Sequence, residues 1–139
     1  MAETLQFELV SPERLVFSEP VEMVVVPGAE GDFGAMPRHS LLISAVRPGV
    51  IDVYQNGLVT HRIFVAGGFA EVTAERCTVL AEEALAVGEL DAGAVASRTD
   101  AARTALNAAA DDRSRAVAQR EVAVCEAMQL ALDPKAVAH

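Results

Sequence analysis

The stretch that decides the fold is residues 50–65, which run VIDVYQNGLVTHRIFV. Its centre, Asn56-Gly57, supplies the two residue types that most easily adopt the positive φ required by the tightest hairpin turns. The runs on either side, residues 50–54 and 58–65, are rich in β-branched residues and alternate as half-buried strands do. Residues 50–65 therefore predict a β-hairpin. The positions expected to share one face of its second strand are Val59, Ile63 and Val65.

Similar strand-sized runs surround this hairpin over residues 1–87, with turn residues about every ten positions. Residues 4–9 alternate polar and apolar side chains, and the β-branched run at residues 21–27 is stopped by a Pro-Gly pair. Evenly spaced strands with no helical stretch between them are typical of an antiparallel sandwich or barrel. We therefore expect residues 1–87 to form an N-terminal antiparallel β-sandwich or barrel. Its last strands are expected at residues 69–73 and 77–81.

The pattern becomes helical from residue 88 onward. Between Ala92 and Ala131 there are fourteen Ala in forty residues, and Gly93 is the one helix breaker. Asp91 is placed to cap a first helix, Asp111-Asp112 to begin a second, and Asp133-Pro134 to end it. Residues 88–139 therefore predict an antiparallel two-helix hairpin. One apolar stripe of the second helix is expected at Val117, Val124, Met128 and Leu132.

Charge and hydropathy exclude several classes of protein. The 139 residues carry 11 Lys and Arg against 20 Asp and Glu, a net charge of −9. This excess opposes binding to nucleic acid and to anionic lipid head groups. No apolar run has the length of a membrane span, and residues 1–3 lack the basic start of a signal peptide. Cys77 and Cys125 stand far apart and are expected to be reduced thiols, so we expect an acidic protein of the cytoplasm.

The sequence offers little catalytic chemistry. His39, His61 and His139 form no motif with a Ser or Cys nucleophile, and His61 is expected to face outward from its strand. The glycines of residues 30–34 lack the Gly-Lys-Ser/Thr ending of a phosphate-binding loop. No acidic loop has calcium-ligand spacing. We therefore expect neither an enzyme active site nor a cofactor or metal site.

Residues 27–42, PGAEGDFGAMPRHSLL, combine turn formers with two acids and with Phe33 and Met36. We expect a wide connection between two strands, with both apolar side chains exposed. Such a loop on a rigid β scaffold is either an ordinary connection or a binding element, because loops often carry binding. The sequence leaves both interpretations open.

The same residues resemble the signature of the ε subunit of F-type ATP synthases, which is called δ in mitochondria. Other segments agree with this family in order and spacing: Val10-Ser11-Pro12-Glu13 with Phe17-Ser18, Arg47-Pro48-Gly49-Val50, residues 64–73 (FVAGGFAEVT) and residues 78–82 (TVLAE). The resemblance implies a non-catalytic rotor subunit of the central stalk, with an N-terminal β-sandwich and a C-terminal helical hairpin. Such a subunit couples proton-driven rotation of the c-ring, through γ, to ATP synthesis in the catalytic head.

The resemblance also implies partners and site residues. The family loop that touches the c-ring corresponds to Glu30, Gly31, Asp32 and Phe33, and the part lying against γ corresponds to Ser11, His39, Ser40 and Leu42. The expected location is peripheral, at the cytoplasmic face of the bacterial inner membrane. Attachment there would run through protein partners, with no direct lipid binding and no nucleic acid.

A second role is implied for the hairpin, which in many bacterial members extends and blocks ATP hydrolysis by contacting the α and β subunits of the head. Here its basic residues are sparse: Arg98, Arg103, Arg113, Arg115, Arg120 and Lys135. Members that bind ATP carry Ile/Leu-Asp-x-x-Arg-Ala. Leu90-Asp91 match this motif but Ala94 replaces the Arg, which predicts no tight ATP site. Two alternatives to the stalk role remain: a regulatory inhibitor, and a free-standing binding module or small-ligand barrel.

Overall fold

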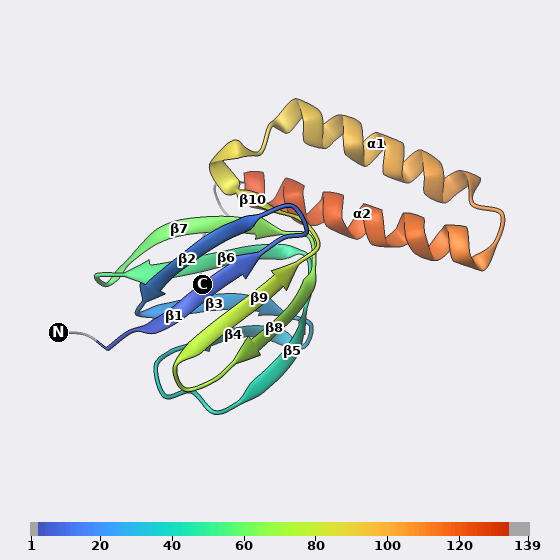
Figure 1. The fold of residues 1–139 in the computed structure, drawn as a ribbon. Coiled ribbons are helices and arrows are strands. Elements are labelled where there is room, and N and C mark those ends of the chain that lie inside the picture. The colour runs from blue at the N-terminus through green and yellow to red at the C-terminus, as the bar shows by residue number, and fades with distance from the viewer. Residues whose placement is uncertain (1–2, 134–139) are drawn as a thin grey trace. The chain divides into compact units, whose positions relative to one another are not determined.

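The computed structural model describes residues 3–133, and the chain divides into two compact units, Met1–Ala86 and Val87–His139. This division falls one residue before the expected boundary at 87/88. Each unit is compact in itself, and Figure 1 shows strands in the first and helices in the second.

The first unit is one curled sheet that folds over on itself as a nearly closed β-sandwich (Figure 1), which confirms the predicted fold class. Within residues 3–133 its strands are β1 (Leu5–Val10), β2 (Leu15–Val21), β3 (Met23–Gly28), β4 (Gly31–Ala35), β5 (Leu42–Val46), β6 (Gly49–Gln55), β7 (Leu58–Val65), β8 (Gly68–Val72), β9 (Arg76–Ala81) and β10 (Ala84–Ala86). The strand order is β10-β7-β6-β3-β5-β8-β9-β1-β2, and β4 pairs with β3 beside this path.

The β6–β7 hairpin has the predicted turn. Asn56 has φ 56° and Gly57 has φ 75°, the left-handed conformation that the Asn-Gly pair supplies at low cost. A bulge follows, because Val53 pairs with His61 but Tyr54 pairs with Val59. The extra residue shifts the side-chain alternation, so Val59 is 41% exposed while Ile63 and Val65 are buried. The expectation that all three share one buried face is therefore wrong for Val59.

The connection expected over residues 27–42 is wrong in its first half. Residues Gly31–Ala35 form β4, which pairs with β3 as a hairpin closed by the two-residue turn Ala29-Glu30. Glycines make this turn feasible: Gly31 has φ 136°, and a Cβ on Gly28 would lie 2.6 Å from the carbonyl oxygen of Gly31. Similarly, the run at residues 21–27 is two strands, since Glu22 separates the end of β2 from the start of β3.

The sheet contains one parallel pair, β1 with β9, so the expectation of a wholly antiparallel sheet is wrong at this point. The two strands lie far apart along the chain, and no hairpin turn fixes their direction. Both contribute to the core, where Phe7 and Leu9 of β1 and Cys77 and Val79 of β9 are buried. The Phe7 and Phe17 rings lie 5.4 Å apart, centre to centre.

The second unit begins with the 3₁₀ turn η1 (Val87–Glu89) and continues as α1 (Ala92–Ala108) and α2 (Asp112–Leu132). The caps are as predicted: the Asp91 carboxylate accepts from the Ala94 N–H at 2.8 Å, and the Asp111 carboxylate accepts from the Ser114 N–H at 2.7 Å. Asp133 ends α2, whereas Pro134, Lys135 and His139 lie outside the described residues.

The buried positions of the hairpin are small or slender: Val95, Thr99, Ala102, Ala118, Val124, Cys125, Met128 and Ala131. The predicted stripe is correct at Val124 and Met128 but wrong at Val117, which is exposed. The buried residue at this level of α2 is Ala118. Within residues 3–133, no helix is long and apolar enough to cross a membrane.

Candidate functional site

The expected ring-facing residues lie together on the tip of the β3–β4 hairpin. Glu30 is in the turn, and Gly31, Asp32 and Phe33 begin β4. Glu30, Gly31 and Asp32 are exposed, whereas Phe33 is half-buried against the sandwich core. The expectation that Phe33 is exposed is therefore wrong, but Met36 is exposed as expected. The tip thus presents polar groups on an apolar base.

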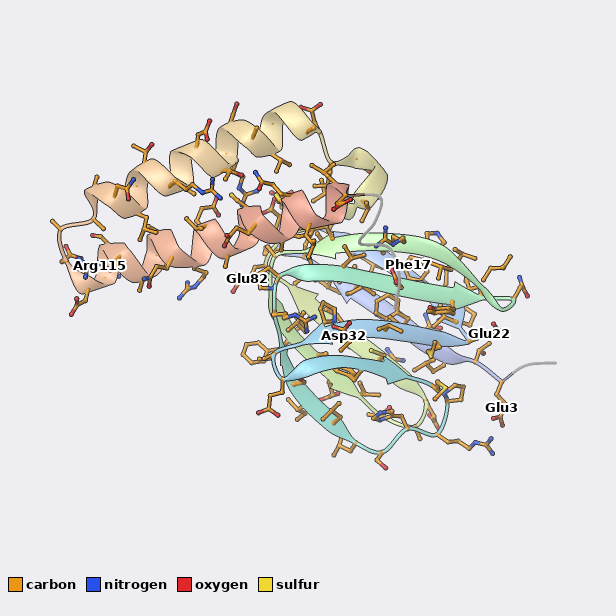
Figure 2. All side chains as sticks on the ribbon, turned by 180° about the vertical axis from the view of Figure 1, so that it is seen from behind. Glu3, Phe17, Glu22, Asp32, Glu82 and Arg115 are labelled. Carbon is orange, nitrogen blue, oxygen red and sulfur yellow. The ribbon has the colours of Figure 1, made fainter. Side chains whose placement is uncertain are left out.

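Arg47 holds this tip through a contact that was not predicted from the sequence. Its guanidinium donates through Nη1 to the carbonyl oxygen of Gly28 and through Nη2 to Oδ1 of Asp32, each at 2.5 Å. The planar guanidinium fork suits two acceptors that lie side by side. Asp32 therefore already has a cationic partner within the chain (Figure 2 shows its position on the sandwich).

The residues expected against γ are not gathered at one point. His39 and Ser40 follow a turn in which the His39 N–H donates to the carbonyl of Met36, and Leu42 begins β5. Ser11 lies at the opposite end of the sheet, in the β1–β2 turn, where its N–H donates to the Arg14 carbonyl. The strand register sets this separation, because Val10 aligns across the sheet with Ala45 and not with Leu42.

A row of outward-facing apolar side chains crosses the sheet between these two groups. The pairing register aligns one residue from each of five adjacent strands: Ala45, Phe69, Leu80, Val10 and Leu15. Phe69, Leu80 and Leu15 are 61%, 57% and 57% exposed. A shallow hollow of about 430 Å³ lies along this outer apolar row and is lined at its edge by Ser11. A contiguous exposed apolar patch rimmed by polar groups is typical of a protein-binding surface.

The outer apolar row was not predicted from the sequence. Its signal was present in β9 and β8, where Leu80 and Phe69 occupy positions that alternation assigns to the solvent side. Only the pairing of β1 with β9 brings those positions beside Val10 and Leu15. That pairing has no local sequence signature, so the row could not be assembled from the sequence alone.

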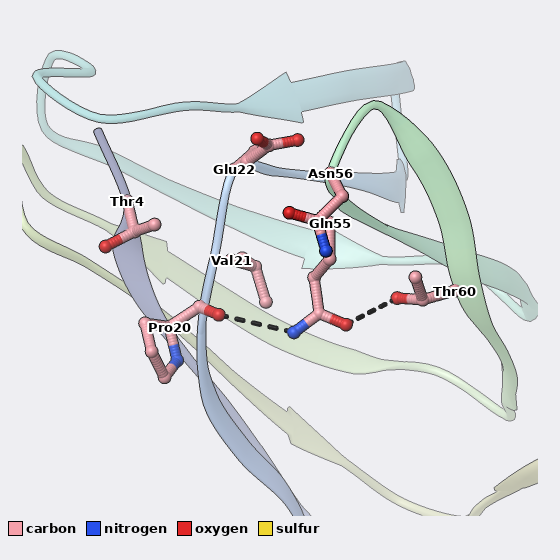
Figure 3. Close-up of a pocket in the computed structure, with 7 residues that line it drawn as sticks. All are labelled: Thr4, Pro20, Val21, Glu22, Gln55, Asn56 and Thr60. Atoms are coloured by element: carbon pink, nitrogen blue, oxygen red, sulfur yellow. Dashed lines mark hydrogen bonds between the residues drawn. The ribbon is translucent and has the colours of Figure 1, made fainter. Parts of the chain in front are cut away.

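A separate pocket of about 480 Å³ lies at the end of the sandwich that holds the β6–β7 turn (Figure 3). Gln55 crosses it: its amide nitrogen lies 3.3 Å from the Pro20 carbonyl, and its amide oxygen accepts from the Thr60 hydroxyl at 2.6 Å. The Gly57 N–H donates to the Glu22 carboxylate at 2.8 Å. These hydrogen bonds connect residues 20–22 to the β6–β7 hairpin, so the polar groups that line the pocket help to hold the two segments together.

Asp91, which matches the family's ATP-binding motif, has a structural contact within the helical hairpin. The Asp91 carboxylate caps α1 by accepting from the backbone of Ala94, the residue that replaces the motif arginine. Arg98, one turn further on, donates through Nε and Nη2 to the two carboxylate oxygens of Glu121, at 2.6 and 3.1 Å. This hydrogen bonding from Arg98 lowers the pKa of Glu121 below its usual range.

The described residues contain no cluster of three or more His, Cys, Asp or Glu side chains that could hold a metal ion. Cys77 is buried, and burial raises the pKa of its thiol to about 12, so little of the nucleophilic thiolate forms near neutral pH. His61 is exposed and lies edge-on to the Phe17 ring. These groups form no catalytic arrangement within residues 3–133.

Comparison with known proteins shows the family to which this two-unit chain belongs. Residues 4–87 match the family model described as ATP synthase, Delta/Epsilon chain, beta-sandwich domain. An ATP synthase epsilon chain from Rhodospirillum rubrum is 61% identical over 128 residues, which cover 92% of this chain and 96% of the relative. The chain belongs to the ATP synthase epsilon chain family. The resemblance drawn from the sequence is confirmed, and the interpretation as an unrelated ligand-binding barrel is excluded.

A second epsilon chain is similar over nearly its full length. That of Maricaulis maris is 50% identical over 129 residues, covering 93% of this chain and 96% of the relative. Among solved structures, a chain of the Euglena gracilis mitochondrial ATP synthase (OSCP/F1/c-ring) has a TM-score of 0.80 at 22% identity and covers 94% of this chain and 82% of its own length. A chain of the Tetrahymena thermophila central stalk and c-ring has a TM-score of 0.67 at 11% identity and covers 93% and 96%. Both likenesses show that chains of these assemblies share the fold of this chain at low sequence identity.

Proposed function

We propose that this epsilon chain is a non-catalytic central-stalk subunit that couples c-ring rotation, through γ, to ATP synthesis in the catalytic head. The observation that carries the proposal is the outer apolar row, an exposed apolar surface on a chain of established ATP synthase family. The structural neighbours come from assemblies described as F1/c-ring and central stalk/c-ring, which supports the choice of partners. The place of action is then peripheral, at the cytoplasmic face of the bacterial inner membrane.

We assign the outer face of β5, β8, β9 and β1 to γ. Ser11 lies at one end of this face and His39 and Ser40 at the other, where Leu42 begins β5 with its side chain packed against the core. The outer apolar row would supply the buried centre of the interface, and the two turns its polar rim. Residues that the strand register keeps apart would then belong to one interface because they border the same face.

We assign the tip of the β3–β4 hairpin, Glu30 to Phe33, to the c-ring. The polar loops of the c-ring are the part of the membrane sector that a peripheral subunit can contact without touching lipid. The exposed polar groups of the tip suit such a contact. The net charge of −9 supports attachment through proteins, since anionic head groups would repel the chain.

The γ assignment is tested by placing a charge in the outer apolar row. Phe69→Glu combined with Leu80→Glu should release the chain from purified ATP synthase and lower ATP synthesis, because both carboxylates would be buried at the interface. Leu58→Glu is the matched control, since Leu58 is 68% exposed in the β6–β7 hairpin, away from the row. Normal retention of the double variant would contradict the assignment.

Inhibition of ATP hydrolysis by the hairpin is the second candidate function. Arg103, Arg113, Arg115 and Arg120 are exposed on the helices and suit acidic loops of the α and β subunits. Deleting residues 89–139 discriminates the two roles. A large rise in ATP hydrolysis by the assembled synthase supports inhibition, whereas unchanged hydrolysis leaves a purely structural stalk role.

A further inference from the structure

The two strands of the β3–β4 hairpin differ in their neighbours: β3 also pairs with β6 and, at Gly28, with Val46 of β5, whereas β4 pairs, among the described strands, with β3 alone. Strand β4 pairs with β3 and lies off the main path of the sheet. Gly28 and Gly31 set the backbone shape of the Ala29-Glu30 turn. They do not set the direction in which the tip points relative to the sandwich.

The segment between β5 and β6 supplies the anchor. The Arg47 N–H donates to the Pro27 carbonyl and the Ala29 N–H donates to the Ala45 carbonyl, both at 2.9 Å. A Cβ on Gly49 would lie 3.0 Å from the Pro27 side chain, so the two segments are in close contact. The Arg47 side chain is thereby brought to the base of the tip.

The Arg47 guanidinium then joins both strands of the hairpin. It donates to the Gly28 carbonyl at the end of β3 and to the Asp32 carboxylate at the start of β4. The two side chains are 44% and 37% exposed, and such half-exposed pairs contribute little to the stability of a fold. The contact therefore affects the orientation of the tip more than the stability of the fold.

The Arg47 guanidinium also gives the two acids of the tip, Glu30 and Asp32, different surroundings. The Asp32 carboxylate lies against a guanidinium, whereas Glu30 has no hydrogen-bond or ion-pair partner within residues 3–133. The charge presented outward at the turn is therefore that of Glu30.

We propose that Arg47 is a positioning residue for the ring contact: it ties Gly28 and Asp32 together so that Glu30 is presented at a fixed place. This rests on the proposed assignment of the tip to the c-ring. The acidic contact with the ring is made by Glu30, and Asp32 acts within the chain.

The test combines two readouts on Arg47→Ala. In the isolated full-length chain, amide hydrogen exchange at residues 29–33 should rise about tenfold or more while the melting temperature moves by less than about 3 °C. In the assembled synthase, the ratio of protons pumped to ATP hydrolysed should fall severalfold. Arg47→Lys should behave like Arg47→Ala, because an ammonium group cannot reproduce the two-pronged geometry. Arg38→Ala, which removes an exposed Arg paired with Glu3, is the matched control and should change neither readout.

Glu30→Lys separates the positioning inference from the proposed ring contact, since it reverses the charge of the tip and leaves the fork intact. It should lower the coupling ratio without raising exchange at residues 29–33. Unchanged exchange in Arg47→Ala, wild-type behaviour of Arg47→Lys, or normal coupling in Arg47→Ala beside defective coupling in Glu30→Lys would each overturn the positioning role. Normal coupling in both Arg47→Ala and Glu30→Lys would overturn the ring contact itself.

Discussion

Among single residues, Asp52 is a buried carboxylate that is paired with a cation on the neighbouring strand. It is 1% exposed, and its carboxylate accepts from Nε of Arg62 on the adjacent strand at 3.1 Å. A buried carboxylate that loses its cationic partner keeps the full cost of its desolvation. This pair lies within the hairpin from which the fold was predicted, yet the sequence alone gave no means of seeing that Asp52 is buried.

Arg62→Met should therefore destabilise the chain by about 2–3 kcal/mol. Urea unfolding of the full-length chain measures this loss. Arg38→Met removes an exposed Arg–Glu pair and should cost no more than about 1 kcal/mol. Equal losses in the two variants would mean that Asp52 is not buried as described.

The two cysteines should be unreactive in the folded chain. Burial raises the thiol pKa of Cys77 to about 12 and also raises that of Cys125, to which the charge of Glu121 adds. At pH 8 a disulfide reagent should label both thiols slowly in buffer and rapidly in denaturant. Rapid labelling of Cys77 in the native chain would contradict its burial.

At the scale of elements, the hairpin of α1 and α2 depends on a polar contact as well as on a seam of small side chains. Arg98 of α1 forms an ion pair with Glu121 of α2. The Gln129 amide lies 3.1 Å from the buried Thr99 hydroxyl. Since Arg98 lowers the pKa of Glu121, the pair stabilises the folded hairpin above the unfolded pKa of glutamate, and this contribution is lost as pH falls through the lower folded pKa.

Amide hydrogen exchange over residues 92–132 should therefore show helix protection that declines on acidification below about pH 4. Glu121→Gln should remove that part of the pH dependence and lower protection at neutral pH. Glu126→Gln changes an exposed Glu of the same helix and is the control. An unchanged acid profile in Glu121→Gln would show that the pair does not hold the hairpin together.

What could be predicted at this scale followed from local chemistry. Asn56-Gly57 specified the β6–β7 turn, and Asp91 and Asp111 marked the starts of the helices, because turns and caps depend on a few adjacent residues. Strand β4 was missed since Gly31 and Asp32 have low strand propensity, and pairing with β3 overrides it. The β1–β9 pair, the outer apolar row and the Arg47 fork were missed because each joins segments that are distant in the sequence.

At the scale of the whole molecule, the chain offers three separate surfaces: an apolar sheet face, a polar hairpin tip and two helices with exposed arginines. Membership of the ATP synthase epsilon chain family gives each of them a partner to be tested. Hydrophobic residues make up 52% of the chain and fall into three groups. They form a Val-, Leu- and Phe-rich core, an Ala-rich hairpin and the outer apolar row, whose exposed side chains are not part of the core.

The proposed stalk role is tested by measuring how proton flow is coupled to ATP turnover in membrane vesicles. The measurement compares synthase depleted of this chain with the same synthase after the full-length chain is added back. We predict that depletion leaves ATP hydrolysis running while ATP synthesis driven by a proton gradient is lost, and that the added chain restores synthesis. Equal rates of gradient-driven synthesis with and without the chain would contradict it.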